Sequence, residues 1–275
     1  MDDDLRERIG TDWAAALAAL AWHVEMGADE AVGDAPSSRY EAAAQPAPAA
    51  AMPVPAALRA DPDEAARRPA KELEVPVADA EAAAASSPTL DALRDAMDAY
   101  PHCELKKGAK SLVFADGRRG ARVMIIGEAP GRDEDIEGRP FVGRAGQLLD
   151  RMIGAIGLSR ASEDPGAAVY ITNVLPWRPP QNREPTPAEI AMLKPFLARH
   201  VALADPAVIV LMGNSALAAV LGTKGITRLR GQWAEAWGRP VLPMFHPAYL
   251  LRNPPAKREA WADLLTLRER LEARA

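Results

Sequence analysis

The chain has 275 residues, 48% of them hydrophobic, and a net charge of −5, which is enough apolar material for one or two domains. No run of about 18 apolar residues is present, and the acidic start at Asp2–Asp4 differs from the basic opening of a signal peptide, so the sequence predicts neither a membrane span nor a secretory leader. A single cysteine, Cys103, excludes an internal disulfide framework and favours a reducing, cytoplasmic location.

The charged residues are distributed unevenly along the chain. Of the 33 basic and 38 acidic residues, 7 and 17 lie in residues 1–87, which leaves 26 and 21 for residues 88–275. Several arginines of the second part lie in loops that follow predicted strands: Arg132, Arg139, Arg144, Arg178, Arg183, Arg230 and Arg252. This arrangement suits contacts with nucleic-acid phosphates, whose affinity comes from counterion release. A solvated, arginine-rich surface gives the same pattern.

Two segments precede the main domain. Apolar residues recur at helical spacing from Leu5 to Met26, which predicts an amphipathic helix within residues 1–28. Residues 29–87 are rich in Ala, Pro and acidic residues without a sustained period, so we expect a disordered linker. The first segment is a candidate arm for docking another protein.

The remaining residues, 88–275, alternate between helical patterns and short apolar runs. After a helix predicted over 89–99, four short β-branched or apolar runs predict strands at 121–126, 168–172, 207–212 and 241–245. Helices are expected between and after these strands, at 142–158, from Thr186 onward with a capping box, at 214–220 and at 255–272. The predicted fold class is therefore α/β: a three-layer α/β/α sandwich around a central four-stranded parallel sheet.

Each predicted strand ends in polar or glycine-rich residues. The first runs into Gly127-Glu128-Ala129-Pro130-Gly131, the second into Asn173, the third into Gly213-Asn214-Ser215 and the fourth into His246-Pro247. Ligands of parallel sheets bind beyond the carboxyl ends of the strands, so a Glu, an Asn and a His are expected to meet in one cleft. The first loop lacks the three-glycine spacing of a dinucleotide-binding turn.

The chemistry of these side chains favours a pyrimidine ligand. The Asn173 amide presents an acceptor and a donor side by side, which complements O4 and N3–H of uracil and mismatches cytosine. His246 can donate a hydrogen bond to developing charge, and Phe141 can stack on a flat base. Taken singly, Asn173 also suits a turn and Phe141 a core position. We interpret His23, His102 and His200 as structural residues.

Three blocks of sequence resemble the uracil-DNA glycosylase superfamily, most closely its family 4. They are Gly127–Leu149, the Thr172–Asn173 strand end with 178–183, and His246–Arg252, and the resemblance covers about residues 89–265. It implies a uracil-DNA glycosylase-like fold and a repair enzyme that flips uracil out of DNA and hydrolyses its glycosidic bond. Family 1 has Asp where this chain has Ala129.

The resemblance also implies a role for each matched residue. Phe141 would stack on uracil, Asn173 would bind its edge beside Gly127 and Ala129, and His246 would stabilise charge on uracil O2. The acid that orients water would be Glu128, Glu134 or Asp135. Contacts with DNA would come from Arg144, Arg178, Arg183, Tyr249, Leu250, Leu251 and Arg252, with Tyr249–Leu251 in a loop that enters the minor groove.

The chain departs from family 4 at the iron–sulfur ligands. Family 4 enzymes usually carry a [4Fe–4S] cluster, and the four ligand positions here hold Tyr100, Cys103, Trp177 and Leu193. Because such clusters need thiolate ligands, we expect neither a cluster nor another metal, and a hydrophobic plug in its place. The motifs contain no lysine, which favours a monofunctional enzyme without a Schiff base. Pro176–Pro180 replaces the histidine-bearing insertion of the branch that traps uracil-DNA covalently.

Three functions remain open from the sequence. The first is a monomeric glycosylase acting on uracil-containing DNA, in the cytoplasm and at the nucleoid. The second is a protein that binds uracil or abasic sites in DNA without cleavage. The third is a nucleotide-metabolising hydrolase, which is disfavoured because no phosphate loop or metal-ligand cluster is present in the sequence.

Overall fold

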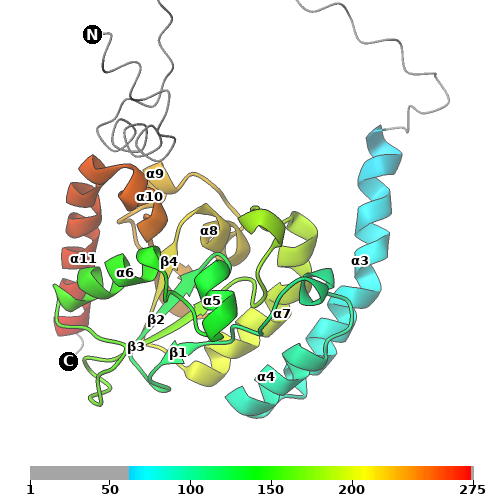
Figure 1. Ribbon diagram of the computed structural model, residues 1–275, viewed down its shortest axis with the longest axis horizontal. Helices are drawn as coiled ribbons and strands as arrows, with labels where there is room; N and C mark the ends of the chain where they lie inside the picture. The colour runs from blue at the N-terminus through cyan, green and yellow to red at the C-terminus, as the bar shows by residue number, and fades with distance from the viewer. Residues whose placement is uncertain (1–61, 274–275) are drawn as a thin grey trace, which may run out of the picture. The chain divides into compact units, whose positions relative to one another are not determined.

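The computed structural model describes residues 62–273, with side chains described from Leu73 onward. Within this range the chain forms a layered α/β domain (Figure 1). The helix predicted within residues 1–28, and the part of the predicted linker that precedes residue 62, lie outside the described residues.

The centre of the domain is a six-stranded sheet in the order β1-β3-β2-β4-β6-β5. Its strands are β1 (Asp116–Gly117), β2 (Val123–Gly127), β3 (Val169–Asn173), β4 (Val208–Met212), β5 (Ala234–Ala236) and β6 (Arg239–Met244). The inner four, β3-β2-β4-β6, are parallel, which confirms the predicted four-stranded sheet. The edge strands β1 and β5 pair in the antiparallel direction and were not predicted.

The described helices occupy most of the sequence between and after the strands. They are α3 (Pro62–Ala85), α4 (Leu90–Ala99), α5 (Arg132–Glu137), α6 (Arg144–Gly154), α7 (Pro187–Ala204), α8 (Asn214–Leu221), α9 (Ile226–Leu229), α10 (Pro247–Arg252) and α11 (Lys257–Glu272). Short 3-10 helices cover Glu104–Lys107, Pro180–Asn182 and Pro254–Ala256. Among the described residues, we find no helix with the length and apolar character needed to cross a bilayer.

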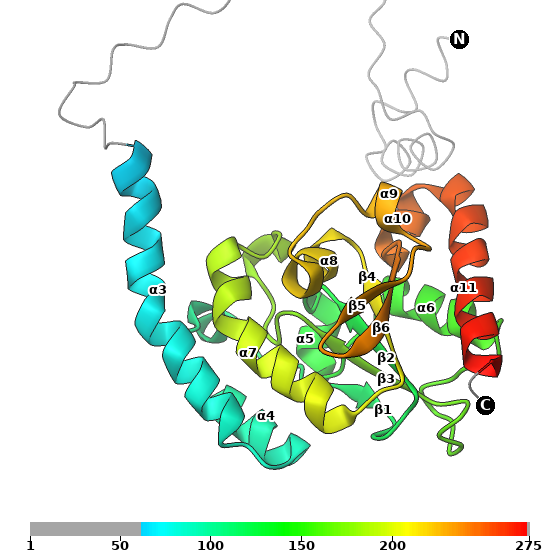
Figure 2. The ribbon, with the colours of Figure 1, turned by 180° about the vertical axis from the view of Figure 1, so that it is seen from behind.

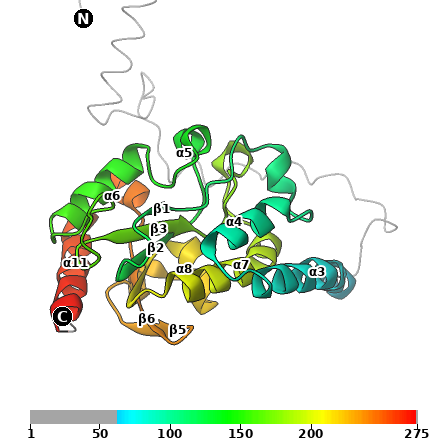
Figure 3. The same ribbon diagram turned by 90° about the horizontal axis from the view of Figure 1, so that it is seen from below.

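Side chains of the buried strands alternate between two cores, as expected for a sheet covered on both faces. In β2, Met124 and Ile126 join the core formed with α4, α7 and α8, whereas Val123 and Ile125 join the core formed with α6 and α11. Figures 2 and 3 show these two helical layers on either side of the sheet. The three-layer α/β/α prediction is confirmed.

The predicted linker over residues 29–87 is wrong in its C-terminal part, because residues 62–85 form α3. This helix packs along α7 and buries Ala80 and Ala84. The Tyr100 hydroxyl donates a hydrogen bond to the Pro76 carbonyl over 2.7 Å, and Arg199 donates one to the Ser87 carbonyl over 2.8 Å. The folded domain therefore begins before residue 88.

Candidate active site

A cavity of about 620 Å³ lies at the carboxyl ends of the parallel strands. Each of these strands contributes a polar side chain at or just after its last residue: Glu128 after β2, Asn173 at the end of β3, Ser215 after β4 and His246 after β6. The strand register explains this convergence, because Gly127 of β2 pairs with Asn173 of β3. The predicted meeting of a Glu, an Asn and a His is thus present in the geometry.

Phe141 enters the same cavity from the loop between α5 and α6. Its ring lies 5.4 Å from the His246 imidazole, centroid to centroid, at an interplanar angle of 29°. Phe141 and Asn173 are 5% and 6% exposed, so both are held firmly while still lining the cavity. A Cβ at Gly127 would lie 2.4 Å from Asn173 Oδ1 and 2.5 Å from Phe141 Cε2. A side chain at Gly127 would therefore displace both groups.

His246 forms the N-cap of α10, and this position fixes its hydrogen-bonding role. Its Nδ1 accepts a hydrogen bond from the Ala248 backbone N–H over 3.1 Å. Burial, helped by the positive charge of Arg252, lowers the pKa of His246 to about 4. The imidazole is therefore neutral near pH 7 and carries its proton on Nε2, which makes Nε2 a hydrogen-bond donor.

Glu128 has a partner that the sequence did not reveal. The Ser215 hydroxyl donates a hydrogen bond to Glu128 Oε2 over 2.6 Å, and both residues line the cavity. The signal available in the sequence was the Gly213-Asn214-Ser215 run at the end of a strand. Asn214, the first residue of α8, accepts hydrogen bonds through its Oδ1 from the backbone N–H groups of Gly225 and Ile226.

The other two candidate acids are engaged by backbone amides. Glu134 lines the cavity, but its carboxylate accepts hydrogen bonds from the N–H groups of Gly131, Val142 and Gly143 at 2.9–3.1 Å. Asp135 is 7% exposed and does not line the cavity.

The carboxylate of Asp135 accepts hydrogen bonds from the N–H groups of Lys110 and Ser111. Both acids thus act as loop braces. Of the three candidates, Glu128 is the one whose carboxylate accepts no backbone amide among the described residues.

The residues expected to contact DNA lie in different surroundings. Arg252 and Arg183 line the cavity, and Arg183 is also paired with Glu189 over 2.8 Å. Arg144 is exposed on the first turn of α6. Arg178 donates a hydrogen bond to Asn182 Oδ1 over 2.8 Å.

The segment from Tyr249 to Leu251, expected to be a loop, forms part of α10. Tyr249 lines the cavity, and Leu251 is half-buried. Leu250 is 1% exposed and belongs to the hydrophobic core, so in this conformation it cannot reach a base stack. Ala129 lines the cavity beside Glu128.

The four residues expected at the iron–sulfur ligand positions are all buried. Tyr100, Cys103, Trp177 and Leu193 are each 3% exposed or less and belong to one core. Burial raises the pKa of the Cys103 thiol to about 11. One protonated thiol among two aromatic rings and a leucine does not fit a cluster that needs thiolates. Among the described residues, no group of three or more His, Cys, Asp or Glu side chains has the arrangement of a metal site.

These observations define an α/β protein with a cavity at the carboxyl ends of its central parallel strands. The parallel strands position the acid, the amide and the neutral histidine around this cavity, and the aromatic ring of Phe141 lines it as well.

Comparison with known sequences identifies the family. A family model described as "Uracil DNA glycosylase superfamily" matches residues 114–265, and the chain belongs to this superfamily. The chain is 39% identical over 188 residues to a type-4 uracil-DNA glycosylase of Archaeoglobus fulgidus, covering 65% of this chain and 91% of that protein. It is 43% identical over 155 residues to one of Thermotoga maritima, covering 55% and 77%. It is 34% identical over 149 residues to a type-5 uracil-DNA glycosylase of Pyrobaculum aerophilum, covering 50% and 66%.

Proposed function

We propose that this protein is a monofunctional uracil-DNA glycosylase, which hydrolyses the N-glycosidic bond of uracil in DNA and leaves an abasic site. The observation that carries the proposal is the convergence of Phe141, Asn173 and His246 on one cavity, which Glu128 lines as well. The relatives named as type-4 uracil-DNA glycosylases support the same substrate.

Recognition of the base rests on a ring and an amide. A base held between two rings needs about 7 Å, twice the usual contact distance of about 3.5 Å. Phe141 and His246 are only 5.4 Å apart. Uracil would therefore stack on Phe141 with His246 at its edge. The Asn173 amide would bind O4 and N3–H, a pairing that cytosine cannot satisfy because its donor and acceptor are reversed.

Departure of the base would be assisted by His246. As the glycosidic bond breaks, uracil leaves as an anion, and the Nε2–H of the neutral imidazole would donate a hydrogen bond to O2. Because Nδ1 is already bonded to the Ala248 amide, the donor is fixed before the substrate arrives. Preorganised donors of this kind are typically worth about 3 kcal/mol of transition-state stabilisation.

Glu128 would act on the sugar side of the bond. Its carboxylate would orient the attacking water and balance the positive charge that develops on the sugar. The Ser215 hydroxyl would hold the carboxylate in place through their 2.6 Å hydrogen bond. We assign Glu134 and Asp135 to loop bracing, because their oxygens are engaged by backbone amides.

Access to uracil requires extrusion from the duplex, at a cost of a few kcal/mol. Arg252, Arg144, Arg178 and Arg183 would offset part of this cost through phosphate contacts. Tyr249 and Leu251 would lie against the strand at the cavity mouth. We propose that Leu250 serves packing, since its side chain is buried.

We also propose that the apolar region of Tyr100, Trp177 and Leu193 replaces an iron–sulfur cluster as the link between the segment before β1 and the segment after β3. Trp177 lies two residues before Pro179, which lines the cavity together with Asn182, Arg183 and Glu184, so this packing would support one wall of the site. Stoichiometric iron and a visible cluster absorption band in the purified protein would contradict this assignment. We further propose that the protein works as a monomer in the cytoplasm and that residues 1–28 bind a partner protein.

One assay tests the proposed function against non-catalytic binding. Labelled oligonucleotides that contain a single uracil, and matched ones with cytosine or thymine, are incubated with the protein and then heated in alkali. We expect strand scission at uracil alone, and only after the alkali step. Retarded migration in a gel without scission would instead favour the binding protein, and scission before alkali would contradict the monofunctional assignment.

A further inference from the structure

The residue proposed to stack on uracil has an unusual backbone conformation. Phe141 has a φ of 55°, in the left-handed region that residues other than glycine rarely adopt. Such a conformation persists only where the surrounding contacts over-determine it, and such residues concentrate at functional sites. The contacts that hold Phe141 therefore decide where its ring lies.

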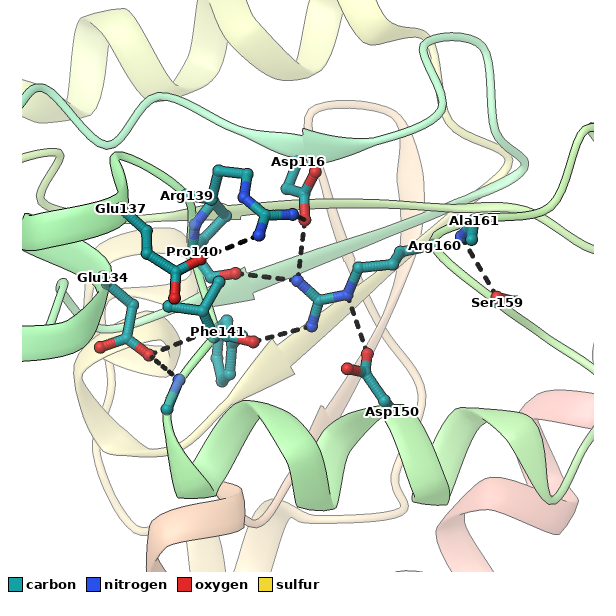
Figure 4. A network of polar contacts seen from close by, with 12 residues as sticks. Asp116, Glu134, Glu137, Arg139, Pro140, Phe141, Asp150, Ser159, Arg160 and Ala161 are labelled. Carbon is teal, nitrogen blue, oxygen red and sulfur yellow. Dashed lines mark hydrogen bonds and ion pairs between the residues drawn. The ribbon is translucent and has the colours of Figure 1, made fainter.

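One side chain holds the backbone of this loop from behind. Arg160, in the segment between α6 and β3, donates hydrogen bonds to the carbonyl oxygens of Pro140 and Phe141, each over 2.9 Å. It also donates to Asp116 over 2.9 Å and to Asp150 over 2.8 Å, as Figure 4 shows. These contacts engage four of the five N–H donors of the guanidinium.

The arginine is itself fixed in place. Its side chain is 14% exposed, and its charge is balanced by Asp116 on β1 and Asp150 on α6. The planar guanidinium can therefore present two donors to two successive carbonyls in one geometry, which a flexible ammonium group cannot do.

The opposite side of the loop is held as well. Glu134, which lies beside Phe141 in Figure 4, accepts hydrogen bonds from the N–H groups of Val142 and Gly143, the two residues that follow Phe141. Gly146 completes the enclosure, because a Cβ there would lie 1.7 Å from the Phe141 carbonyl oxygen. The peptide groups around Phe141 are thus held by the Arg160 cation on one side and the Glu134 anion on the other, and the Phe141 ring lines the cavity.

We propose that Arg160 is a positioning residue for uracil excision: it holds Phe141 in the left-handed conformation that presents its ring to the base. This inference rests on the proposed function, since it concerns the ring that stacks on uracil. Arg160 does not line the cavity and touches neither the base nor the sugar site. Its effect is carried by two carbonyl groups and the loop between them.

The test is a double-mutant cycle under single-turnover conditions with a uracil-containing single strand. Arg160→Ala is expected to lower the excision rate about 30-fold, and Arg160→Lys, which keeps the charge beside Asp116 and Asp150, about fivefold. In a Phe141→Ala background, Arg160→Ala should change the rate less than about threefold, because the ring it positions is absent. Arg122→Ala is the matched control, since Arg122 donates to the Leu271 carbonyl over 2.9 Å and does not line the cavity.

The outcomes separate positioning from general stability. Circular dichroism and thermal unfolding are recorded for every variant, and Arg160→Lys carries the test if Arg160→Ala does not fold. The inference would be overturned if Arg160→Ala lowered the excision rate by the same factor in the Phe141→Ala background as in wild type. It would also be overturned if Arg122→Ala lowered the rate as much as the Arg160 variants do. So would a folded Arg160→Ala or Arg160→Lys with the wild-type rate. Wild-type protein that excises no uracil would overturn the proposed function and this inference together, whereas active wild type with unaffected variants overturns this inference alone.

Discussion

The protonation state of His246 offers a quantitative test of the proposed mechanism. Burial and the charge of Arg252 lower the pKa of His246 to about 4. At pH 5.5 about 97% of such a histidine is neutral, compared with about 9% for a histidine at its ordinary pKa of about 6.5. The single-turnover excision rate should therefore change less than about 1.5-fold between pH 7.5 and 5.5, instead of falling about tenfold. Below pH 5 the rate should fall as the imidazole takes up its proton.

The measurement is a pH profile of uracil excision under single-turnover conditions, with folding checked by circular dichroism at each pH. His246→Gln is the matched control, because its side-chain amide can donate a hydrogen bond but does not titrate. We expect a lower rate for His246→Gln and a parallel, flat profile from pH 7.5 to 5.5. A wild-type rate that drops about tenfold with a midpoint near pH 6.5, while the control stays flat, would refute the argument from burial.

Three further predictions concern stability and the division of roles. Burial lowers the pKa of His200 to about 3. As the pH falls below about 6.5 this histidine is protonated in the unfolded chain but stays neutral in the folded chain until about pH 3. The free energy of unfolding therefore decreases as the pH falls from about 6.5 to about 3. At pH 5 the loss is about 2 kcal/mol by denaturant titration relative to pH 7.5, and His200→Gln should lack this component; equal pH dependence in both proteins would contradict it. Trp177→Ala should lower the free energy of unfolding by about 3–5 kcal/mol, and a loss below about 1 kcal/mol would show that the ring does not support the core. His246→Ala should raise the barrier to excision by about 3 kcal/mol with little change in the affinity for uracil-containing DNA, whereas equal losses in both would argue against a role in bond breaking.

The layers of the fold could be predicted from local sequence because its four central strands are short apolar or β-branched runs that are largely buried on both faces. The edge strands β1 and β5 give no predictive pattern in the sequence, because they are two and three residues long and only partly buried. Helix α3 was missed for a different reason. It buries Ala80 and Ala84 instead of large apolar side chains, and Pro69 and Pro76 interrupt its pattern. Small buried residues leave a weak periodic signal even where the packing is close.

The candidate site could be located from sequence because parallel strands bring their carboxyl ends together. That rule placed Glu128, Asn173 and His246 near one another without any knowledge of distances. The rule says nothing about contacts between distant segments. The hydrogen bonds of the Glu134 carboxylate with backbone amides and the burial of Leu250 depend on tertiary packing, so local sequence patterns do not predict them.

Arg160 belongs to the same class of long-range contacts. It is separated from Phe141 by 19 positions in the chain, and nothing in its own neighbourhood distinguishes it from a surface arginine. Only the folded loop shows that its guanidinium meets two carbonyls beside a left-handed residue.

The central claim is that Phe141 and Asn173 bind a uracil base and that His246 assists its departure. The most direct measurement compares wild type with Asn173→Ala on oligonucleotides that carry either uracil or cytosine at one position. We predict that wild type releases uracil only, and that Asn173→Ala loses at least about 100-fold in rate because the base edge loses both hydrogen-bond partners. A folded Asn173→Ala protein that excises uracil as fast as wild type would contradict the account.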